Sequence, residues 1–215
     1  MIAHSHIDLV FPVHGRTLPR DHGYALYGAL SRALPDLHQA GWLGVHGIAA
    51  ASGMDPERLN LAKSGRLRLR IPVERLPQLI ALAGRALAVS GHTIRLGPPS
   101  VHPLHAAASL DARLVVIRLT RGVDKPFDRA RFDARFEAEA RRQLERIGVA
   151  GELSLCGHRS VRVGGQRVMG HSVRVIGLSP EHSLALQIHG LGGKRAMGCG
   201  IFRPTRRVLA IEAAA

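Results

Sequence analysis

The sequence predicts an α+β protein of two tandem ferredoxin-like domains, each with the element order βαββαβ. Two observations support this fold class. Segments of strand and helix character follow one another in the same order in both halves of the 215-residue chain. A segment rich in turn formers, without apolar periodicity, separates the halves. We therefore expect an N-terminal domain over residues 1–97, a linker over 98–110 and a C-terminal domain over 111–215.

The first half begins with a strand and a helix. Residues 6–13 form an apolar run rich in strand formers, which predicts a buried central strand. Asp21 can cap the next helix, whose apolar residues repeat at helical spacing until Pro35 disrupts the pattern. Residues 42–50 then predict the second strand.

The first half ends with two strand segments and a helix between them. Arginine alternates with apolar residues over 66–71, which predicts a strand with three arginines on one face. Three cations cannot all be buried at low cost, so this face should be partly solvated. Pro72 starts a helix over 73–83, and residues 86–96 predict a last strand or a hairpin turning at Ser90 and Gly91.

The second half repeats this order. Gly164 and Gly165 separate two strand-like segments and suit a tight hairpin turn. Ser179 and Pro180 are typical of a helix start. The predicted elements are strand 113–119, helix 127–147, strands 152–163 and 168–176, helix 179–189 and strand 200–208.

The composition favours a polyanionic partner. Thirty Lys and Arg against sixteen Asp and Glu give a formal net charge of +14, and 46% hydrophobic residues suffice for a core. Nucleic acid is the first candidate, since no apolar run or basic amphipathic helix suits a membrane. The first residues lack a secretory signal, and two cysteines indicate no disulfide framework. We expect a cytoplasmic protein.

A glycine-rich stretch at residues 190–202 organises the C-terminal half. It follows a helical pattern and leads into a strand, whereas a dinucleotide-binding loop follows a strand and opens a helix. Glycine allows positive φ and close approach to a polyanion. A Rossmann site is therefore not expected. The glycines that frame the stretch are Gly190, Gly192, Gly198 and Gly200.

This pattern, GhGxxxxxGhG with h apolar, resembles the signature loop of the repeat-associated mysterious protein superfamily of CRISPR systems. Residues 8–13 and 18–31 look like the opening strand and first helix of its endoribonucleases, which cut precursor CRISPR RNA within each repeat. The resemblance spans nearly the whole chain. It implies two ferredoxin-like domains side by side and a CRISPR repeat RNA partner, as a stem-loop or a single strand. It also allows contacts with other CRISPR effector-complex subunits.

The resemblance also implies the chemistry. A ribose 2′-hydroxyl attacks the adjacent phosphate without metal, leaving a 2′,3′-cyclic phosphate, and this needs an acid, a base and a cation. The family takes a histidine and a tyrosine from the first helix or just after it, which here offers His22, Tyr24, Tyr27, His38 and His46. Several relatives carry their histidine where this chain has Tyr27. Because His46 and His38 follow the helix, they rank first and second, and His22 is a candidate to position the turn.

Binding should depend mainly on cations. Only 4% of the residues are aromatic, so phosphate contacts and shape must contribute more than base stacking. About half of the arginines named here should simply be solvated. The predicted RNA-binding residues are Arg66, Arg68, Arg70, Arg159, Arg162, Arg167, Arg174, Gly190, Gly192, Lys194, Arg195, Gly198, Gly200, Arg203 and Arg206.

Other functions are less favoured. Among thirteen histidines, His4 with His6 and His102 with His105 have plausible ligand spacing, but no thiolate pair, His-Glu-x-x-His motif or acidic cluster accompanies them. We expect neither a metal nor another cofactor. The main alternatives are a non-catalytic RNA-binding subunit of a CRISPR effector complex and a basic RNA-binding protein unrelated to CRISPR.

Overall fold

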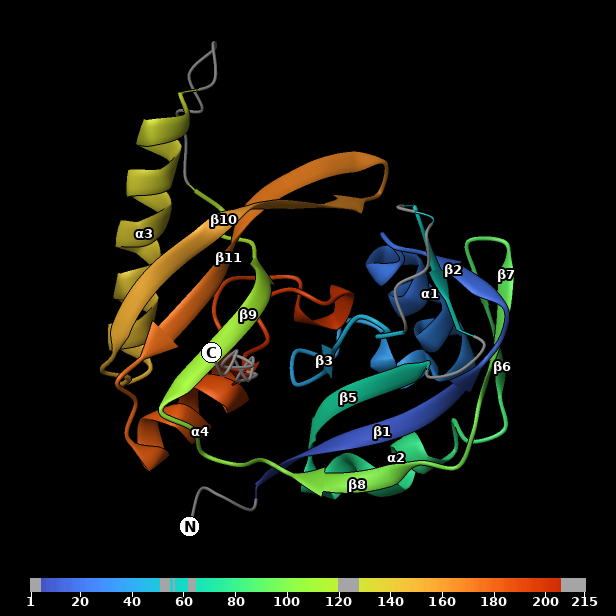
Figure 1. The fold of residues 1–215 in the computed structure, drawn as a ribbon. Coiled ribbons are helices and arrows are strands. Elements are labelled where there is room, and N and C mark those ends of the chain that lie inside the picture. The colour runs from blue at the N-terminus through green and yellow to red at the C-terminus, as the bar shows by residue number, and fades with distance from the viewer. Residues whose placement is uncertain (1–4, 51–54, 56, 62–64, 120–127, 206–215) are drawn as a thin grey trace, which may run out of the picture.

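Two mixed helix-and-strand units lie side by side, the N-terminal one coloured blue to green and the C-terminal one yellow to red (Figure 1). Each contains a curled antiparallel sheet with the strand order of a ferredoxin-like domain. The predicted fold class is confirmed. The computed structural model describes residues 5–50, 55, 57–61, 65–119 and 128–205.

The N-terminal sheet has the order β3-β5-β1-β7-β6, and β8 also pairs with β1. As predicted, β1 is a buried central strand, because apolar residues fill most of its positions. Strands β2 and β4 form a separate pair. The elements are β1 (His6–His14), β2 (Thr17–Pro19), α1 (Gly23–Ala33), the 3₁₀ turn η1 (Pro35–Leu37), β3 (Gly44–Val45), β4 (Arg58–Asn60), β5 (Arg66–Pro72), η2 (Val73–Arg75), α2 (Leu76–Ile80), β6 (Ala86–Val89), β7 (His92–Leu96) and β8 (Ser100–Pro103).

The C-terminal sheet has the order β10-β11-β9-β12. Strands β10 and β11 form the predicted hairpin, and its turn residues Gly164 and Gly165 have φ of 57° and 82°. Ser179 caps α4, as expected, by accepting a hydrogen bond from the His182 N–H. The elements are β9 (Ser109–Val115), α3 (Arg129–Arg146), β10 (Glu152–Val163), β11 (Gln166–Ile176), α4 (Pro180–His189), η3 (Arg195–Met197) and β12 (Arg203–Pro204).

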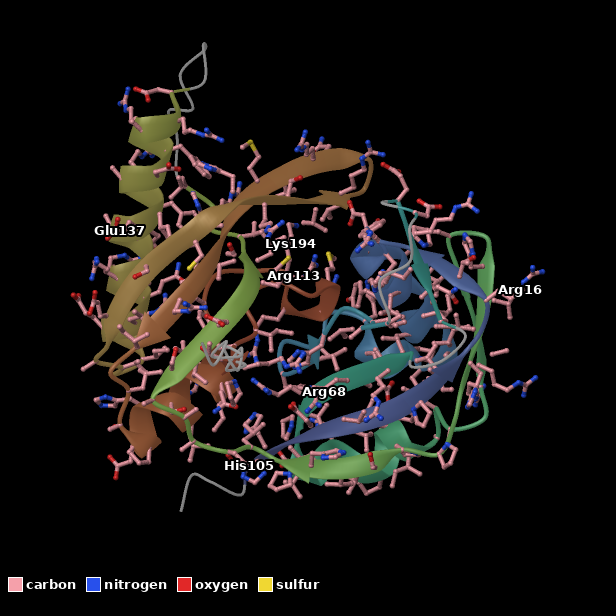
Figure 2. The ribbon with its side chains drawn as sticks, viewed as in Figure 1. Arg16, Arg68, His105, Arg113, Glu137 and Lys194 are labelled. Carbon is pink, nitrogen blue, oxygen red and sulfur yellow. The ribbon has the colours of Figure 1, made fainter. Side chains whose placement is uncertain are left out.

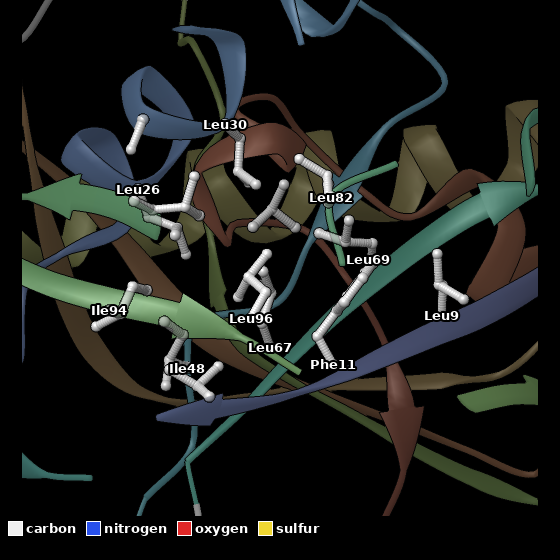
Figure 3. Close-up of a cluster of buried hydrophobic side chains, with 14 of the residues drawn as sticks. Leu9, Phe11, Leu26, Leu30, Ile48, Leu67, Leu69, Leu82, Ile94 and Leu96 are labelled. Carbon is white, nitrogen blue, oxygen red and sulfur yellow. The ribbon is translucent and has the colours of Figure 1, made fainter. Parts of the chain in front are cut away.

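In each domain, helices pack against the sheet, and a hydrophobic core lies between them. In the N-terminal domain, Leu9 and Phe11 of β1 meet Leu26 and Leu30 of α1 in a cluster of buried leucine, isoleucine and valine side chains (Figure 3). In the C-terminal domain, Phe136 of α3 lies in the corresponding core. These side chains exclude water from both layers, and their burial is the main term that stabilises the fold.

The expected linker contains a strand. Residues 100–103 form β8, which pairs antiparallel with β1, and all four side chains are exposed. Backbone hydrogen bonds pair this segment with β1, and neither of its faces is buried. Its sequence therefore lacks the alternation of apolar and polar residues from which strands are predicted.

Several predicted elements differ in extent. Residues 42–50 contain only the short β3, and residues 73–83 divide into η2 and α2. The strand predicted at 113–119 begins earlier, at Ser109, and the last strand is reduced to β12 within the described residues. In these segments, short apolar runs are buried by tertiary packing without regular pairing. Among the described residues, no helix combines the length and apolar character needed to cross a membrane.

Asp21 does not cap α1, contrary to expectation. The helix begins after His22 without a side-chain cap, and Asp21 Oδ2 instead accepts a hydrogen bond of 2.9 Å from the Arg162 N–H on β10. The carboxylate therefore joins the first helix to the C-terminal hairpin, a contact between residues that are distant in sequence.

Arg70 of β5 is buried where the two domains meet. Its guanidinium donates to both carboxylate oxygens of Asp8 at 2.9 and 3.1 Å. It also donates to the carbonyl oxygens of Gln187 and Phe202, at 3.0 and 2.6 Å, in the C-terminal domain. One side chain thus connects β1 and β5 to α4 and to the segment before β12.

The three arginines of β5 have different surroundings. Arg66 is exposed, Arg68 is half-buried and bonds Asp8 at 2.9 Å, and Arg70 is 1% exposed. Burial raises the pKa of Asp8, but the hydrogen bond and charge of Arg70 outweigh this effect and lower the pKa to about 2. The prediction that Arg70 binds RNA is wrong, because its donors are used inside the protein.

Replacing Arg70 should therefore destabilise the fold far more than replacing Arg66. Arg70→Ala leaves the Asp8 carboxylate and two carbonyl groups buried without their partner, and we expect a loss of about 3 to 5 kcal/mol in the free energy of unfolding. Arg66→Ala, on the same strand, should change it by about 0.5 kcal/mol or less. Urea unfolding of both variants measures the difference, and equal stabilities would contradict this role of Arg70.

Candidate nucleic-acid interface and active site

The glycine-rich loop, residues 190–200, lies where the domains meet. Its short turn η3 contacts α1 and β3 of the N-terminal domain. A Cβ on Gly23 would collide with the Met197 carbonyl, and a Cβ on Gly190 would collide with the Gly200 carbonyl. Gly190 and Gly200 also have positive φ, of 65° and 67°. The glycines are therefore required for close backbone packing at this junction.

Most backbone N–H groups of this loop bond within the protein. Gly192 donates to Gln143 Oε1, Gly193 to Val116 O, and Gly200 to Leu114 O. Leu191 donates to the Gly200 carbonyl. These N–H groups are not free to hold phosphate, so the expectation that the loop glycines grip RNA through their N–H groups does not fit the geometry.

The two cations of the loop differ. Arg195 turns inward and donates from Nη2 to the Ile188 carbonyl at the end of α4, at 2.7 Å. Burial, and next the charge of Arg70, lower the pKa of Arg195 to about 10. Arg195 is therefore a poor candidate for phosphate binding. Lys194, which has a left-handed backbone, lies between the two domains together with Arg113 (Figure 2).

A cleft of about 480 Å³ opens between the domains. Gly47 and Gly198 line it where the domains approach each other, and Arg113 of β9 extends into it. The sequence prediction missed Arg113, because a single arginine in an apolar strand carries no signal of its own. The cationic residues of the cleft are Arg113, Arg159, Arg174 and Arg203.

His46 forms part of the wall of this cleft, but its ring is only 7% exposed. Its Nε2 lies 3.9 Å from Asp8 Oδ1 and has no hydrogen-bond partner. Burial lowers the pKa of His46 well below its usual value, and the Arg70 charge lowers it further while Asp8 opposes the change. His46 is therefore a buried, neutral imidazole beside the Asp8–Arg70 pair.

His22 is held at both ring nitrogens. Nδ1 donates to the Pro19 carbonyl at 2.7 Å, so Nε2 is left to accept from the Ile48 N–H at 2.9 Å. Burial lowers the pKa of His22, which favours this neutral form. His22 thus positions the chain before α1, and its nitrogens are not available to a substrate.

A second hollow, of about 600 Å³, runs along α1 and η1. Tyr24, Tyr27 and His38 all line it, so three of the predicted catalytic residues meet there. The rings of Tyr27 and His38 stack with centroids 6.4 Å apart, and the Tyr27 hydroxyl accepts from the Gln39 N–H at 2.8 Å. His38 is exposed. We call this surface the α1 hollow.

Arg32 adds a cation to the α1 hollow. Its Nη2 donates to the Ala88 carbonyl at 3.1 Å, and the residue is exposed. It was not among the predicted site residues. It lies five residues after Tyr27, so helical spacing does not place the two on one face, and it reaches the hollow on the side of Gly28, four residues before it.

The β10–β11 hairpin reaches over to the start of α1 (Figure 1). Asp21 accepts from the Arg162 N–H, and a Cβ on Gly164 would come within 4.0 Å of the Tyr24 hydroxyl. Arg162 and Arg167 are exposed on this hairpin, beside one end of the α1 hollow. The hairpin thus brings predicted RNA-binding residues to the predicted catalytic helix.

The remaining predicted cations lie elsewhere. Arg68 pairs with Asp8, and Arg174 pairs with Asp111 at 2.7 and 3.2 Å, although Arg174 stays exposed in the cleft. Arg66 is exposed on β5. Arg206 lies outside the described residues. Of the described cations predicted to bind RNA, those exposed in the cleft or on the hairpin are Arg159, Arg162, Arg167 and Arg174.

Comparison with known proteins identifies relatives over nearly the whole chain. A family model described as Cas6 Crispr matches residues 7–207. A curated protein of Myxococcus xanthus (strain DK1622), the CRISPR-associated endonuclease Cas6, is 41% identical over 206 residues, covering 96% of this chain and 84% of that protein.

Solved structures share the fold at low sequence identity. A CRISPR associated protein Cas6 matches with a TM-score of 0.67 and 12% identity, over 94% of this chain and 99% of that one. An RAMP protein binding different RNA substrates matches with a TM-score of 0.64 and 13% identity, over 94% and 100% of the two chains. With the family model and the curated relative, this shows that the chain belongs to the Cas6 family of CRISPR-associated proteins.

Proposed function

We propose that this protein is an endoribonuclease that cleaves precursor CRISPR RNA within each repeat. The ribose 2′-hydroxyl attacks the neighbouring phosphate through general acid–base catalysis, without metal, and the guide RNA product carries a 2′,3′-cyclic phosphate. Membership of the Cas6 family and the endonuclease name of the 41% identical relative support the reaction class.

One structural observation carries the assignment of the site. His38, which is exposed, lines the α1 hollow together with Tyr27. The hairpin that carries Arg162 and Arg167 meets the same helix at Tyr24. A phosphodiester held by the hairpin therefore reaches a proton-transfer group and a hydroxyl on one surface. This juxtaposition supports the proposal, because acid and base groups must come within hydrogen-bond reach of the reacting oxygens.

Each residue of the α1 hollow has a role in this proposal. His38 exchanges a proton with the 2′-hydroxyl or the leaving 5′-oxygen, since an imidazole can do either near neutral pH. The Tyr27 oxygen already accepts from Gln39, which leaves its own hydrogen to donate to a phosphate oxygen. Arg32 places its positive charge beside the phosphorane, where negative charge develops during the reaction.

The geometry favours His38 over His46, which reverses the order expected from the sequence. His46 is 7% exposed and its Nε2 is buried beside Asp8, so this nitrogen is poorly placed to exchange a proton with a ribose. His38 is exposed and stacks on a tyrosine. We propose that His46 packs at the interface and that His38 performs the proton transfer.

The repeat RNA follows the cationic surfaces toward the α1 hollow in this proposal. Arg113 and Arg159 in the interdomain cleft contact phosphates, and the hairpin continues this surface. Because shape and phosphates supply the affinity, a folded repeat suits the surface better than stacked single bases.

The reaction class can be tested with purified protein. A cognate repeat RNA should be cut in the presence of EDTA, because the attacking oxygen belongs to the substrate and side chains move the protons. The same RNA with one 2′-deoxy nucleotide at the cut should bind and remain intact. Cleavage of the deoxy substrate would refute this mechanism, and binding without any cleavage would favour the non-catalytic RNA-binding subunit.

The assignment of His38 can be tested by single-turnover kinetics. His38→Ala should lower the cleavage rate about 100- to 10,000-fold, which is the usual contribution of a proton-transfer group. Repeat affinity should stay within a few fold, because such a group adds little ground-state binding. Tyr27→Phe should have a smaller effect in the same direction.

Two histidine variants serve as controls for this assignment. His105→Ala removes an exposed histidine at the domain junction, and His46→Ala removes the buried one. Both should cleave at rates within a few fold of the unmodified protein at temperatures where they are folded. Loss of cleavage in a folded His46→Ala variant, with His38→Ala active, would reverse the assignment.

The RNA path can be tested through the salt dependence of binding. Arg113→Ala with Arg159→Ala should weaken repeat binding and lower the slope of log K against log salt by about 1.4 to 1.8, since each lost phosphate contact removes about 0.7 to 0.9. A matched control, Arg16→Ala with Arg85→Ala, removes two exposed arginines outside the cleft lining. Equal slopes in the two double variants would remove the cleft from the RNA site.

A further inference from the structure

Three side chains of potential metal ligands meet in the C-terminal domain, outside the sites described above. Asp133 lies on α3, His158 on β10 and His171 on β11. Asp133 Oδ1 is 2.8 Å from His158 Nε2 and 3.0 Å from His171 Nε2. Each of the three residues offers one potential ligand atom, and these three atoms all lie within 4.8 Å of one another.

His171 is unusual for a buried polar residue. It is 1% exposed, and neither of its ring nitrogens has a well-aligned hydrogen bond, although Nε2 lies close to Asp133. Buried polar atoms in proteins are nearly always paired, and an exception calls for an explanation such as a missing ion. A simple hydrogen-bonded cluster accounts for His158, which bonds Asp133, and for the 3.0 Å contact of His171 Nε2 with the same carboxylate, but it leaves the buried Nδ1 of His171 without a partner.

The surroundings of the cluster are apolar on one side. Phe132 and Phe136 of α3 lie against the His171 ring, with centroids 5.6 and 4.7 Å away. The two imidazole rings are themselves 4.3 Å apart. An apolar shell of this kind limits solvent access to a metal centre and fixes the orientation of its ligands.

We propose that Asp133, His158 and His171 bind one divalent transition-metal ion, with Zn²⁺ the best match. Two imidazoles and one carboxylate form a known ligand set for zinc, and a water molecule completes the tetrahedron. Hard cations such as Mg²⁺ prefer oxygen ligands, so they match this set poorly.

The ligand atoms must adjust their spacing to admit the ion. Zinc lies about 2.0 to 2.2 Å from nitrogen and carboxylate ligands, which places ligand atoms of a tetrahedral site about 3.3 Å apart. The two nitrogen–oxygen distances of 2.8 and 3.0 Å must therefore widen by a few tenths of an ångström, and the ligand nitrogens of the two histidines, which lie within 4.8 Å of each other, must take about the same spacing. Asp133 and His158 are half-buried, so the ion can enter from solvent beside α3.

The ion would be structural. It ties α3 to both strands of the hairpin that carries Arg159, Arg162 and Arg167, and it lies in a different domain from the α1 hollow. Hydrogen bonds within the cluster allow the domain to fold without metal, and the ion adds stability to that folded state. The cleavage chemistry does not use it.

Zinc binding can be measured on full-length protein without a histidine tag. After EDTA treatment and removal of the chelator, equilibrium dialysis against limiting ZnCl₂ and elemental analysis should give about one zinc per chain. Zinc at about 100 times its Kd should raise the melting temperature by about 5 to 10 °C. Asp133→Asn keeps the shape and can still hydrogen-bond, but we expect it to lose both effects.

Further variants separate this site from background binding by the other histidines. His158→Ala should behave as Asp133→Asn does, whereas His102→Ala, which removes an exposed histidine on β8, should retain the zinc and the thermal shift. Failure of the unmodified protein to bind zinc, or zinc binding that survives in both Asp133→Asn and His158→Ala, would overturn the proposal.

The outcome is independent of the proposed endoribonuclease activity. Asp133→Asn with zinc removed should still cut repeat RNA at a temperature where it is folded, because His38 and Tyr27 are unchanged. A protein that binds no zinc and cleaves RNA would reject only the metal site, and a protein that binds zinc and cleaves nothing would reject only the nuclease.

Discussion

The arrangement of the two domains depends on one buried cation. Among the described residues, Arg70 has the largest fully buried side chain, and a buried guanidinium is stable only when hydrogen-bond acceptors surround it. Asp8 satisfies it from β1, and the carbonyls of Gln187 and Phe202 satisfy it from the other domain. The carbonyl groups have those positions only when the domains meet at one angle. The hydrogen bonds of Arg70 therefore specify how the two domains are oriented. This effect is separate from the stability gained through the surface area that the interface buries.

The functional surfaces follow from that interface. With the domains so placed, the glycine-rich loop lies so close to α1 that Gly23 cannot carry a side chain, and the loop's own backbone packs so tightly that Gly190 and Gly200 cannot carry one either. The interdomain cleft forms beside the loop, and the β10–β11 hairpin extends to Asp21 and Tyr24 at the start of α1. The signature glycines thus act by shaping the junction, and the arginines around it are those that we propose to contact RNA.

Much of the fold could be predicted from the sequence, because it depends on local patterns. The apolar run of β1, the glycine pair between β10 and β11 and the Ser179–Pro180 helix start each specify their element. The segment 100–103 could not be recognised as a strand, since only its backbone is used. The sequence also indicated the neighbourhood of α1, where we propose the catalytic residues. It could not separate His46 from His38, because the burial of His46 depends on its packing beside Asp8 and Arg70, which are distant in sequence.

In the proposed function, the scissile phosphate lies in the α1 hollow. Photocrosslinking tests this directly, with a repeat RNA that carries a photoreactive nucleotide at the cut and a 2′-deoxy sugar to prevent cleavage. After digestion, mass spectrometry identifies the attached peptide. We predict attachment within residues 24–38, which include Tyr24, Tyr27 and His38. Attachment confined to residues 44–48 around His46 would contradict the account.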